Sequence, residues 1–350
     1  MTTADRILAQ CARYPALTPQ DLLKFLHQSV FGPGHLVKDD AGGLAFLRAE
    51  AAACRDDQGL EPLDGEFLRA HLGLLKSSLT PETLWGCFRL SAEVPAGTVE
   101  DLEARLTTAL DLAKEGRLPF SYEEASAAIV QWRAQGFPAQ RHSEAFRAAY
   151  APAYRVLHRD YAWILPLLTA IDRKMAVGKP IIVALEGGSA SGKTTLSEKL
   201  RAIYGCPVFH MDDFFLQPHQ RTVERLATPG GNVDHERFLA DVLLPCRNEK
   251  TVHYRRWDCQ TQSLQPPVDV PPTPLTIVEG AYSCHPALRE HYDLTVYLSI
   301  SPTLQRRRVE QRNTPDFQQR FFDTWIPLEQ RYFEAFDIPG HCDLILEVQP

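Results

Sequence analysis

Residues 187–194 read GGSASGKT, and their spacing fits the pattern G-x-x-x-x-G-K-[ST]. This pattern forms a loop whose backbone N–H groups, together with the start of the next helix, surround phosphate oxygens. An apolar run at 181–187 precedes the pattern, and a helix-like segment at 194–204 follows it. The sequence therefore predicts a phosphate-binding loop that holds a nucleotide. Its predicted residues are Gly187, Gly188, Ser189, Ala190, Ser191, Gly192, Lys193, Thr194 and Thr195.

Two side chains next to this loop are typical of a magnesium–nucleotide site. Lys193 is expected to contact the β- and γ-phosphates, and the Thr194 hydroxyl is a hard oxygen ligand of the kind that Mg²⁺ prefers. Glu279 ends a third apolar run, and a carboxylate beside such a loop commonly holds the metal directly or through water. The predicted cofactors are ATP or GTP with Mg²⁺, and the predicted metal ligands are Thr194 and Glu279.

A pair of acids, Asp212 and Asp213, follows the second apolar run in the string FHMDDFFL. The ends of parallel strands meet at one edge of a sheet, where ligands bind. A transfer of phosphate to a hydroxyl needs a group that orients the hydroxyl and accepts its proton. Only one of two adjacent side chains is expected to point into the cleft, and we predict that Asp212 is this general base. The alternative is a pair of turn or helix-capping acids.

A cluster of arginines at 306–308 and 312 follows the fourth apolar run. Arg308 and Arg312 are four residues apart on an expected helix, and guanidinium groups stabilise the charge that spreads over a moving phosphate. We therefore predict that both are catalytic and belong to a lid over the nucleotide. The alternative is a solvated helix face.

The elements that must position these residues follow from the apolar pattern. Short apolar runs alternate with helix-like segments after the string AVGKP at 176–180, at 181–187, 206–212, 275–281, 294–300 and 343–348. This alternation predicts an α/β domain at 179–350 with a parallel sheet covered by helices on both faces. The segment 265–274 holds five prolines and is predicted to be an extended connector.

Residues 1–178 are predicted to form a mainly α-helical domain of unknown role. Amphipathic patterns run through 18–30, 98–116, 121–136 and 142–175, with Thr18 and Thr98 as expected helix caps. Strand-like alternation is scarce in this half. The spacing of His35, His71 and His142 matches no known metal-ligand set, so these residues are expected to be structural or exposed.

The composition of the 350 residues excludes several classes of protein. The net charge of −7 argues against a nucleic-acid or anionic-membrane surface. No apolar run reaches the ~20 residues that a membrane-spanning helix needs. The eight cysteines are irregularly spaced and form no C-x-x-C pair, which favours reduced thiols in a cytoplasmic protein. The oligomeric state stays open, and a homo-oligomer is compatible with the sequence.

The order of the motifs resembles the uridine kinase–phosphoribulokinase group of P-loop kinases over about residues 180–348. The strings that carry the resemblance are GGSASGKTT, MDDFF, GGNVDHERF, VHY, IVEGAYS and RRRVEQR. By pattern, the nearest relatives are uridine–cytidine kinases and, for DDFF and WIPLEQRY, nicotinamide riboside kinases. The resemblance implies a five-stranded parallel core with an arginine-bearing lid, Asp212 as general base and Glu279 as metal-site acid. It also implies that Asp234 binds ribose hydroxyls and that Tyr254 lies near the base of the acceptor.

The sequence thus predicts a kinase that transfers the γ-phosphate to a hydroxyl of a nucleoside or related ribosyl compound. The hairpin after Tyr254 lacks the histidine that the family usually carries, so the acceptor stays open, with Arg255, Arg256 and Asp258 as candidates for reading it. One alternative is a nucleotide-gated regulator whose helical domain binds a protein partner. Another is a sugar-phosphate or vitamin kinase on the same scaffold.

Overall fold

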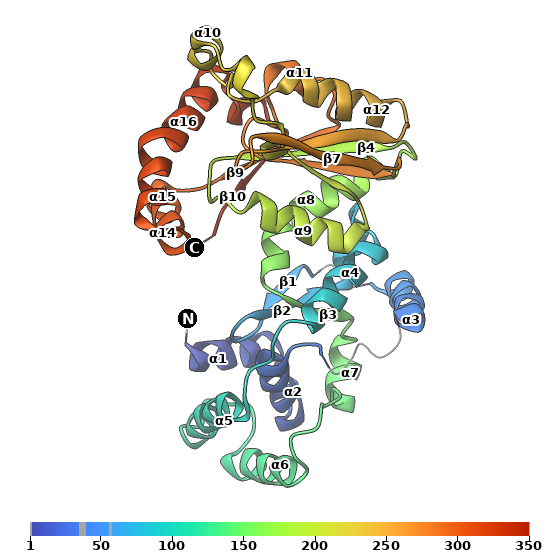
Figure 1. Cartoon of the computed structure of the whole chain (residues 1–350). Helices are drawn as coiled ribbons and strands as arrows, with labels where there is room; N and C mark the ends of the chain where they lie inside the picture. Colours follow the sequence, from blue (N-terminus) through green and yellow to red (C-terminus); the bar gives the residue numbers. More distant parts are fainter. Residues whose placement is uncertain (1, 35–39, 56–57, 350) are drawn as a thin grey trace. The chain divides into compact units, whose positions relative to one another are not determined.

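The computed structural model describes residues 2–34, 40–55 and 58–349. The chain forms two compact units, Met1–Leu165 and Pro166–Pro350 (Figure 1). The division falls within helix α8 (Asp160–Met175), upstream of the boundary that the sequence suggests at 178/179. That boundary stays a prediction.

The first unit is rich in helices, and the cap predicted at Thr98 forms. Thr98 begins α5: its hydroxyl accepts a hydrogen bond from the Asp101 N–H at 3.1 Å, and the Asp101 carboxylate accepts one from the Thr98 N–H at 2.8 Å. This reciprocal arrangement satisfies donors that a helix start would otherwise leave open. The helices are α1 (Thr3–Arg13), α2 (Pro19–Phe31), α3 (Asp40–Ala53), α4 (Pro81–Ala92), α5 (Val99–Lys114), α6 (Tyr122–Ala134) and α7 (Glu144–Tyr150).

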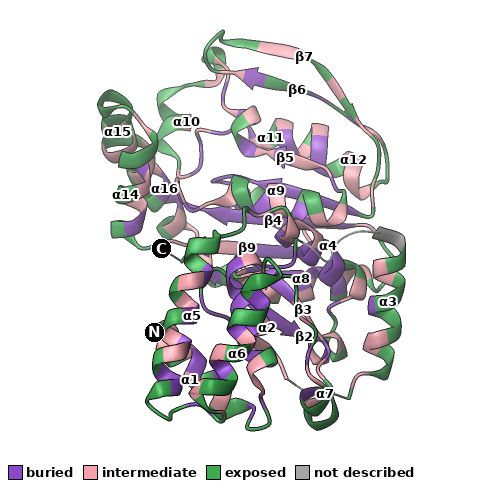
Figure 2. Cartoon of the chain, turned by 90° about the horizontal axis from the view of Figure 1, so that it is seen from below, coloured by how far each residue is buried: buried purple, intermediate pink, exposed green. Residues whose placement is uncertain are grey.

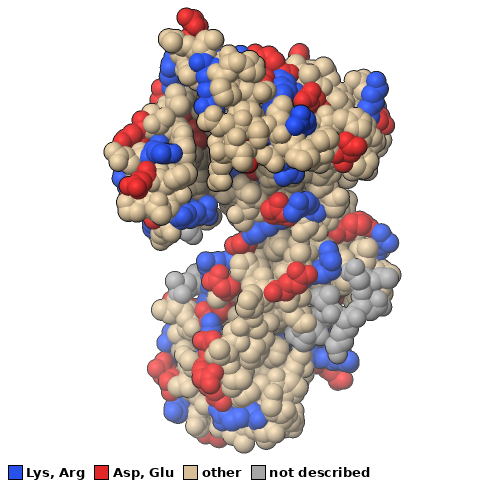
Figure 3. All heavy atoms as spheres, viewed as in Figure 1, with Lys and Arg blue, Asp and Glu red and all other residues tan. Residues whose placement is uncertain are grey.

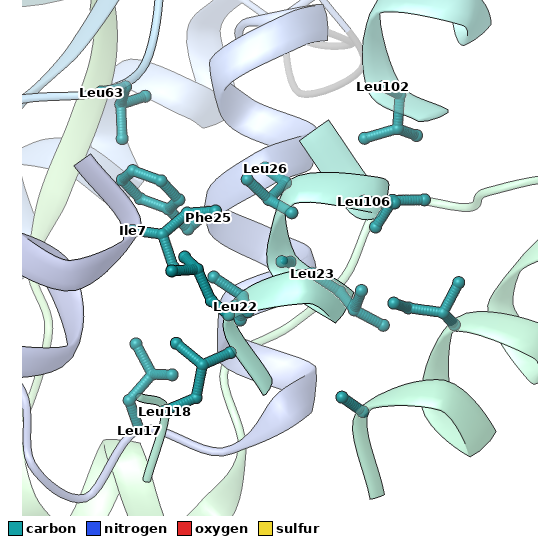
Figure 4. Packing of buried hydrophobic residues seen from close by; sticks show 14 of the residues in the cluster. Ile7, Leu17, Leu22, Leu23, Phe25, Leu26, Leu63, Leu102, Leu106 and Leu118 are labelled. Atoms are coloured by element: carbon teal, nitrogen blue, oxygen red, sulfur yellow. The ribbon is translucent and has the colours of Figure 1, made fainter. Parts of the chain in front are cut away.

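The core of the first unit lies around α2. Leu22, Leu23 and Leu26 are buried on this helix, as the apolar stripe of the sequence predicts, and they pack with Leu102 and Leu106 of α5 (Figure 4). Burying such side chains is the main favourable term in folding. The first unit therefore has a hydrophobic core of its own.

A small antiparallel sheet in the first unit was not predicted. It consists of β1 (Leu60–Pro62), β2 (Phe67–His71) and β3 (Tyr154–His158) in the order β1-β2-β3. Strand β3 lies within 142–175, which the sequence pattern assigns to helix, so this assignment is wrong at that point. The strand has only five residues, too few for its alternation to stand out between two helices.

The second unit is built on a five-stranded parallel sheet in the order β10-β9-β4-β8-β5. The strands are β4 (Ile181–Gly187), β5 (Val208–His210), β8 (Leu275–Glu279), β9 (Leu294–Ser299) and β10 (Leu344–Glu347). Each coincides with one of the predicted apolar runs. Every residue of the central strand β4 is buried, as expected where helices cover both faces of a sheet (Figure 2).

Helices lie on both sides of this sheet. In Figure 1, α9 (Lys193–Tyr204) lies on one side of the sheet, and α11 (His235–Phe238) and α12 (Leu244–Arg247) lie on the other. Buried side chains from both the sheet and the α11–α12 region, such as Phe209, Val278 and Phe238, share one hydrophobic core. The remaining helices are α10 (Val223–Ala227), α13 (Pro286–Arg289), α14 (Pro302–Arg312), α15 (Pro315–Arg320) and α16 (Ile326–Ala335).

The proline-rich segment is not a plain connector. Most of it belongs to β7 (Ser263–Val270), which pairs with β6 (Val252–Asp258) as an antiparallel hairpin. Pro267 lies opposite Arg255, next to an irregularity in the register. Both strands of a two-stranded hairpin are edge strands, so a proline can direct its missing N–H away from the ladder. The prediction of a connector is wrong for this reason.

The surface mixes both signs of charge. On the face drawn in Figure 3, Lys and Arg side chains are interspersed with Asp and Glu side chains. Among the residues that the structure describes, no helix combines the length and the apolar character needed to cross a bilayer.

Candidate active site

Three neighbouring strands bring the predicted site residues to one edge of the sheet. Strand β8 lies between β4 and β5, and Glu279 pairs in register with Leu185 on one side and His210 on the other. Because the strands are parallel, their carboxyl ends open at the same edge, where α/β proteins bind ligands. The loop 187–195 begins at this edge of the sheet, and Asp212 and Glu279 lie at the same edge.

The backbone of the loop depends on glycine. Gly187 has φ +146° and Gly192 has φ +97°, both in a region that side chains rarely adopt. A Cβ at Gly187 would lie 2.8 Å from the Leu298 carbonyl oxygen, so the loop has no room for a side chain there. Gly192 directly precedes α9, whose N-terminal N–H groups lack partners within the helix. The loop thus has the backbone of an anion-binding site.

The lysine of the loop folds back over it. Lys193 Nζ donates hydrogen bonds to the carbonyl oxygens of Gly187 at 2.8 Å and Gly188 at 3.0 Å. The ammonium group therefore lies across the loop, in reach of an anion that the loop would bind.

Thr194 and Glu279, the two predicted metal ligands, lie in contact. The Thr194 hydroxyl donates to Glu279 Oε1 at 3.1 Å, and His210 Nδ1 lies 2.5 Å from the same oxygen. This hydrogen bond to the buried carboxylate raises the pKa of His210. Hydroxyl and carboxylate oxygens are the donors that Mg²⁺ prefers, so Thr194 and Glu279 fit this ion. His210 was not among the predicted site residues.

The two adjacent acids face different surroundings. Both lie on a short 3₁₀ turn, Met211–Phe214. The Asp213 carboxylate faces Arg256, with Oδ2 at 3.5 Å from Nε, whereas Asp212 is exposed to water. Partial desolvation by the crowded cleft raises the pKa of Asp212, while the nearby Lys193 ammonium lowers it. Because the side chain opens to water, Asp212 is available to a ligand at the sheet edge.

Only one of the two predicted lid arginines contacts the loop. Arg308 donates a hydrogen bond through Nη1 to the Ala190 carbonyl oxygen at 3.3 Å. Arg312 lies one turn further along α14 and is exposed. Arg306 pairs with Glu310 and packs over the Phe322 ring, 4.3 Å from its centroid. The roles of Arg308 and Arg312 stay predictions, and the geometry favours Arg308.

Asp234 and Tyr254, the predicted acceptor-binding residues, are buried in the second unit. Asp234 caps α11, accepting a hydrogen bond from the Arg237 N–H at 3.0 Å and one from Gln220 Nε2 at 2.7 Å. The Tyr254 ring stacks on Phe214 at a centroid distance of 5.7 Å. A contact of either residue with an acceptor stays a prediction. At Asp234, a hydroxyl of the acceptor would replace the hydrogen bond from Gln220.

Two residues that the sequence reasoning missed also contact the loop. Glu329 of α16 accepts hydrogen bonds from the Ser189 N–H at 2.8 Å and the Ser189 hydroxyl at 2.6 Å. Gln305 of α14 donates to the Ser189 carbonyl oxygen at 2.8 Å. Ser189 lies 116 positions from Gln305 and 140 positions from Glu329. Glu329 belongs to the string WIPLEQRY, which is the one signal that could have directed attention to it, whereas none of the strings that carry the resemblance contains Gln305.

A third missed residue, Glu186, lies directly before the loop and is fully buried. Its carboxylate accepts hydrogen bonds from the N–H groups of Gly187 at 2.8 Å, Cys284 at 2.9 Å and Tyr282 at 3.2 Å, and from the Tyr332 hydroxyl at 3.1 Å. Burial raises the pKa of Glu186 to about 7, against the opposing effect of these donors. Glu186 therefore links the loop to the segment after β8 and to α16.

The histidines of the first unit are structural within the described residues. His71 Nε2 lies 2.8 Å from Glu61, and His142 Nδ1 lies 2.9 Å from Asp21. His35 lies outside the described residues. No group of three or more His, Cys, Asp or Glu residues in the described part of the chain is arranged to hold a metal ion.

Comparisons with known proteins each cover about half of the chain. No family model matches. A uridine kinase of Macrococcus caseolyticus is 28% identical over 155 residues, which are 41% of this chain and 72% of that protein. A uridine kinase of Limosilactobacillus reuteri is 28% identical over 174 residues, which are 45% of this chain and 78% of that protein.

Solved structures give weaker similarities. A possible uridine kinase from Bacillus stearothermophilus shares 19% identity, with 52% of this chain and 99% of that chain covered and a TM-score of 0.38. A putative fructose transport system kinase from Silicibacter is 23% identical over 48% of this chain and 89% of that chain, with a TM-score of 0.40. The sequence similarity to these uridine kinases, together with the parallel sheet and its loop, supports a relation of this chain to the uridine kinase-like P-loop kinases.

Proposed function

We propose that the protein is a small-molecule kinase that transfers the terminal phosphate of ATP or GTP, with Mg²⁺, to a hydroxyl group of a nucleoside or a related ribosyl compound. The observation that supports this proposal most is the convergence of three groups at one sheet edge. The loop 187–195 would bind the phosphates, Glu279 and Thr194 would hold the metal, and Asp212 lies open beside them. A protein that only bound a nucleotide would not need an open carboxylate at this position.

The proposed reaction is an in-line displacement. The acceptor oxygen forms a bond to the γ-phosphorus while the bond from that phosphorus to the β–γ bridging oxygen breaks, and the nucleoside diphosphate leaves. Asp212 orients the acceptor hydroxyl and takes its proton. Mg²⁺ held by Thr194 and Glu279 would neutralise charge on the phosphates.

The cationic side chains have distinct proposed roles. Lys193 would exchange its two carbonyl partners in the loop for oxygens of the β- and γ-phosphates. Arg308, anchored on Ala190, is the lid arginine best placed to stabilise charge on the transferred group. Both groups would bind more strongly to the transition state than to the separate reactants, which is the basis of catalysis.

The acceptor is the open part of the proposal. The names of the curated relatives support a nucleoside, and the resemblance assigns Asp234 to a ribose. Asp234 and Tyr254 are both buried, and the adjoining hairpin carries Arg255 and Arg256. A ribosyl compound other than uridine, a sugar phosphate or a vitamin remain candidates.

An acceptor screen tests the proposal. The full-length protein with Mg²⁺ and ATP, or GTP, is incubated with uridine, cytidine, nicotinamide riboside, pantothenate and ribulose 5-phosphate. Nucleoside diphosphate and phosphorylated acceptor are quantified against an acceptor-free control. We expect formation of both in equal amounts with a ribosyl compound. Nucleotide binding without transfer to any acceptor would instead favour a nucleotide-gated regulator.

A further inference from the structure

Glu329 places a carboxylate on the phosphate-binding loop itself. Both of its oxygens are engaged with Ser189: one accepts from the N–H at 2.8 Å and the other from the hydroxyl at 2.6 Å. Only 5% of Glu329 is exposed. A buried carboxylate needs such donors, because a charge removed from water without partners is strongly unfavourable.

Glu329 lies near groups that we expect to surround the γ-phosphate of a bound nucleotide. Burial raises the pKa of Glu329, the nearby Lys193 ammonium opposes this rise, and Asp212 is close enough to add to it. The carboxylate is thus near the residues that we expect on either side of the γ-phosphate. Backbone N–H groups of such loops bind phosphoryl oxygens. A carboxylate and a phosphate are both anionic acceptors and compete for the same donors.

The helices that carry the lid residues also hold the loop. Gln305 and Arg308 of α14 donate to the carbonyl oxygens of Ser189 and Ala190. Among Gln305, Arg308 and Glu329, only Glu329 is an anion, and only Glu329 accepts hydrogen bonds from the loop. It is therefore the contact that a bound polyphosphate would repel.

We propose that Glu329 is an internal anion of the phosphate-binding loop: it occupies the donors of Ser189, lowers the affinity for nucleoside triphosphates, and leaves Ser189 when the terminal phosphate binds. The inference rests on the proposed role of loop 187–195 in binding a nucleotide and is independent of the acceptor. Glu329 is a positioning residue that sets nucleotide affinity through Ser189, and its departure moves the start of α16.

The variant Glu329→Gln tests the charge while keeping the shape. The glutamine oxygen accepts from the Ser189 N–H, and its amide group donates to the Ser189 hydroxyl, so both polar atoms keep partners. Glu334→Gln is the matched control, because Glu334 lies on the same helix, loses the same charge and is exposed. Affinities for ATP and AMP are measured by calorimetry without any acceptor.

We expect Glu329→Gln to bind ATP about tenfold more tightly than the wild type, the order of effect of removing one nearby like charge. AMP lacks the terminal phosphate, so its affinity is expected to change less than twofold. Glu334→Gln is expected to match the wild type for both ligands. In turnover assays the KM for ATP is expected to fall in Glu329→Gln with kcat changed less, and amide hydrogen exchange of 326–335 is expected to rise when ATP binds the wild type.

Other outcomes overturn the inference. Equal ATP affinity in the wild type and Glu329→Gln would show that Glu329 does not compete, although the loop binds nucleotide as proposed. If neither protein binds any nucleotide, the proposed function falls together with the inference. If Glu329→Gln does not fold, Glu329→Asp provides a second comparison that keeps the charge, because its shorter side chain withdraws the carboxylate from the donors of Ser189. Glu329→Asp is then expected to bind ATP more tightly than the wild type, and unchanged affinity contradicts the inference.

Discussion

At the scale of single residues, the carboxyl group of Glu186 makes the free energy of unfolding depend on pH. Its carboxyl is fully buried, and burial raises its pKa to about 7 from the ordinary value of 4.5. A carboxyl with a raised pKa in the folded state keeps its proton where the unfolded chain has already lost it. Its contribution to stability is therefore present below pH 4.5 and is lost progressively as pH rises towards 7. Above pH 7 the loss is complete.

The loss of stability with rising pH leads to a prediction for Glu186→Gln. Relative to the wild type, the variant is expected to gain roughly 3 kcal/mol in unfolding free energy between pH 4.5 and pH 8, since glutamine does not ionise. The absolute stability at low pH is expected to be lower than in the wild type, because the amide NH₂ replaces one carboxylate oxygen and faces the N–H donor of either Gly187 or Cys284. Urea denaturation at several pH values measures both effects. A difference between the two proteins that does not change with pH would contradict the pKa.

At the scale of secondary-structure elements, a buried ion pair joins β1 and β2 in the first unit. Arg69 Nη1 donates to Glu61 Oε1 at 2.8 Å, with both side chains almost fully buried, and Arg69 also donates to Gln28. Burial acts to raise the pKa of Glu61, but the hydrogen bond from His71 and the charge of Arg69 outweigh it and lower the pKa to about 2. The ionised pair is thus a structural part of the small sheet.

Breaking this pair is expected to destabilise the first unit. Arg69→Ala leaves Glu61 buried without its cation, which typically costs about 3–5 kcal/mol. Because the pKa of Glu61 is lowered, its stabilising effect is present above pH 4.5 and is lost as pH falls towards 2. Denaturant unfolding of Arg69→Ala at pH 7 and pH 3 measures the effect, with the exposed Arg133→Ala as control. A loss below 1 kcal/mol at pH 7 would contradict the importance of the pair.

The secondary-structure elements also show how much of the fold and of the site the sequence can predict. The parallel strands were predictable because each is a continuous apolar run bounded by breaks, as in Ile181–Gly187. Strand β3 was not, because it is stabilised by β2, which is far away along the chain. The strand β7 was not either, because its prolines indicate a break in a ladder although its partner β6 is its neighbour in a hairpin. The loop 187–195 follows from local spacing, and so does the carboxylate at Asp212. Glu329 reaches the loop through tertiary packing over 140 positions. Glu186 directly precedes the loop, but its role depends on donors from other segments, such as the Cys284 N–H, which the local pattern does not show.

At the scale of the whole molecule, the chain contains two compact units, each with a hydrophobic core of its own. Separate cores favour separate cooperative transitions. We expect two unfolding transitions in a thermal or urea scan. Addition of ATP with Mg²⁺ is expected to raise the midpoint of one transition by mass action, because only the unit from Pro166 onward carries the loop.

Calorimetry with and without nucleotide measures this behaviour. At 100 times the dissociation constant, the affected transition is expected to gain about 2.7 kcal/mol. Arg69→Ala is expected to lower the other transition. A single transition that shifts as a whole would contradict the independence of the two cores.

We propose that Asp212, at the edge formed by β4, β8 and β5, is the general base of a kinase. The most direct measurement compares the wild type with Asp212→Asn, using the acceptor found in the screen, and records turnover and ATP affinity together. Asparagine keeps the size of the side chain but cannot accept the proton, so we expect kcat to fall about 10²–10⁴-fold. ATP affinity is expected to stay within a few-fold, because Asp212 does not contact the loop donors. Turnover retained in Asp212→Asn would contradict the account and turn attention to Asp213 and Glu329.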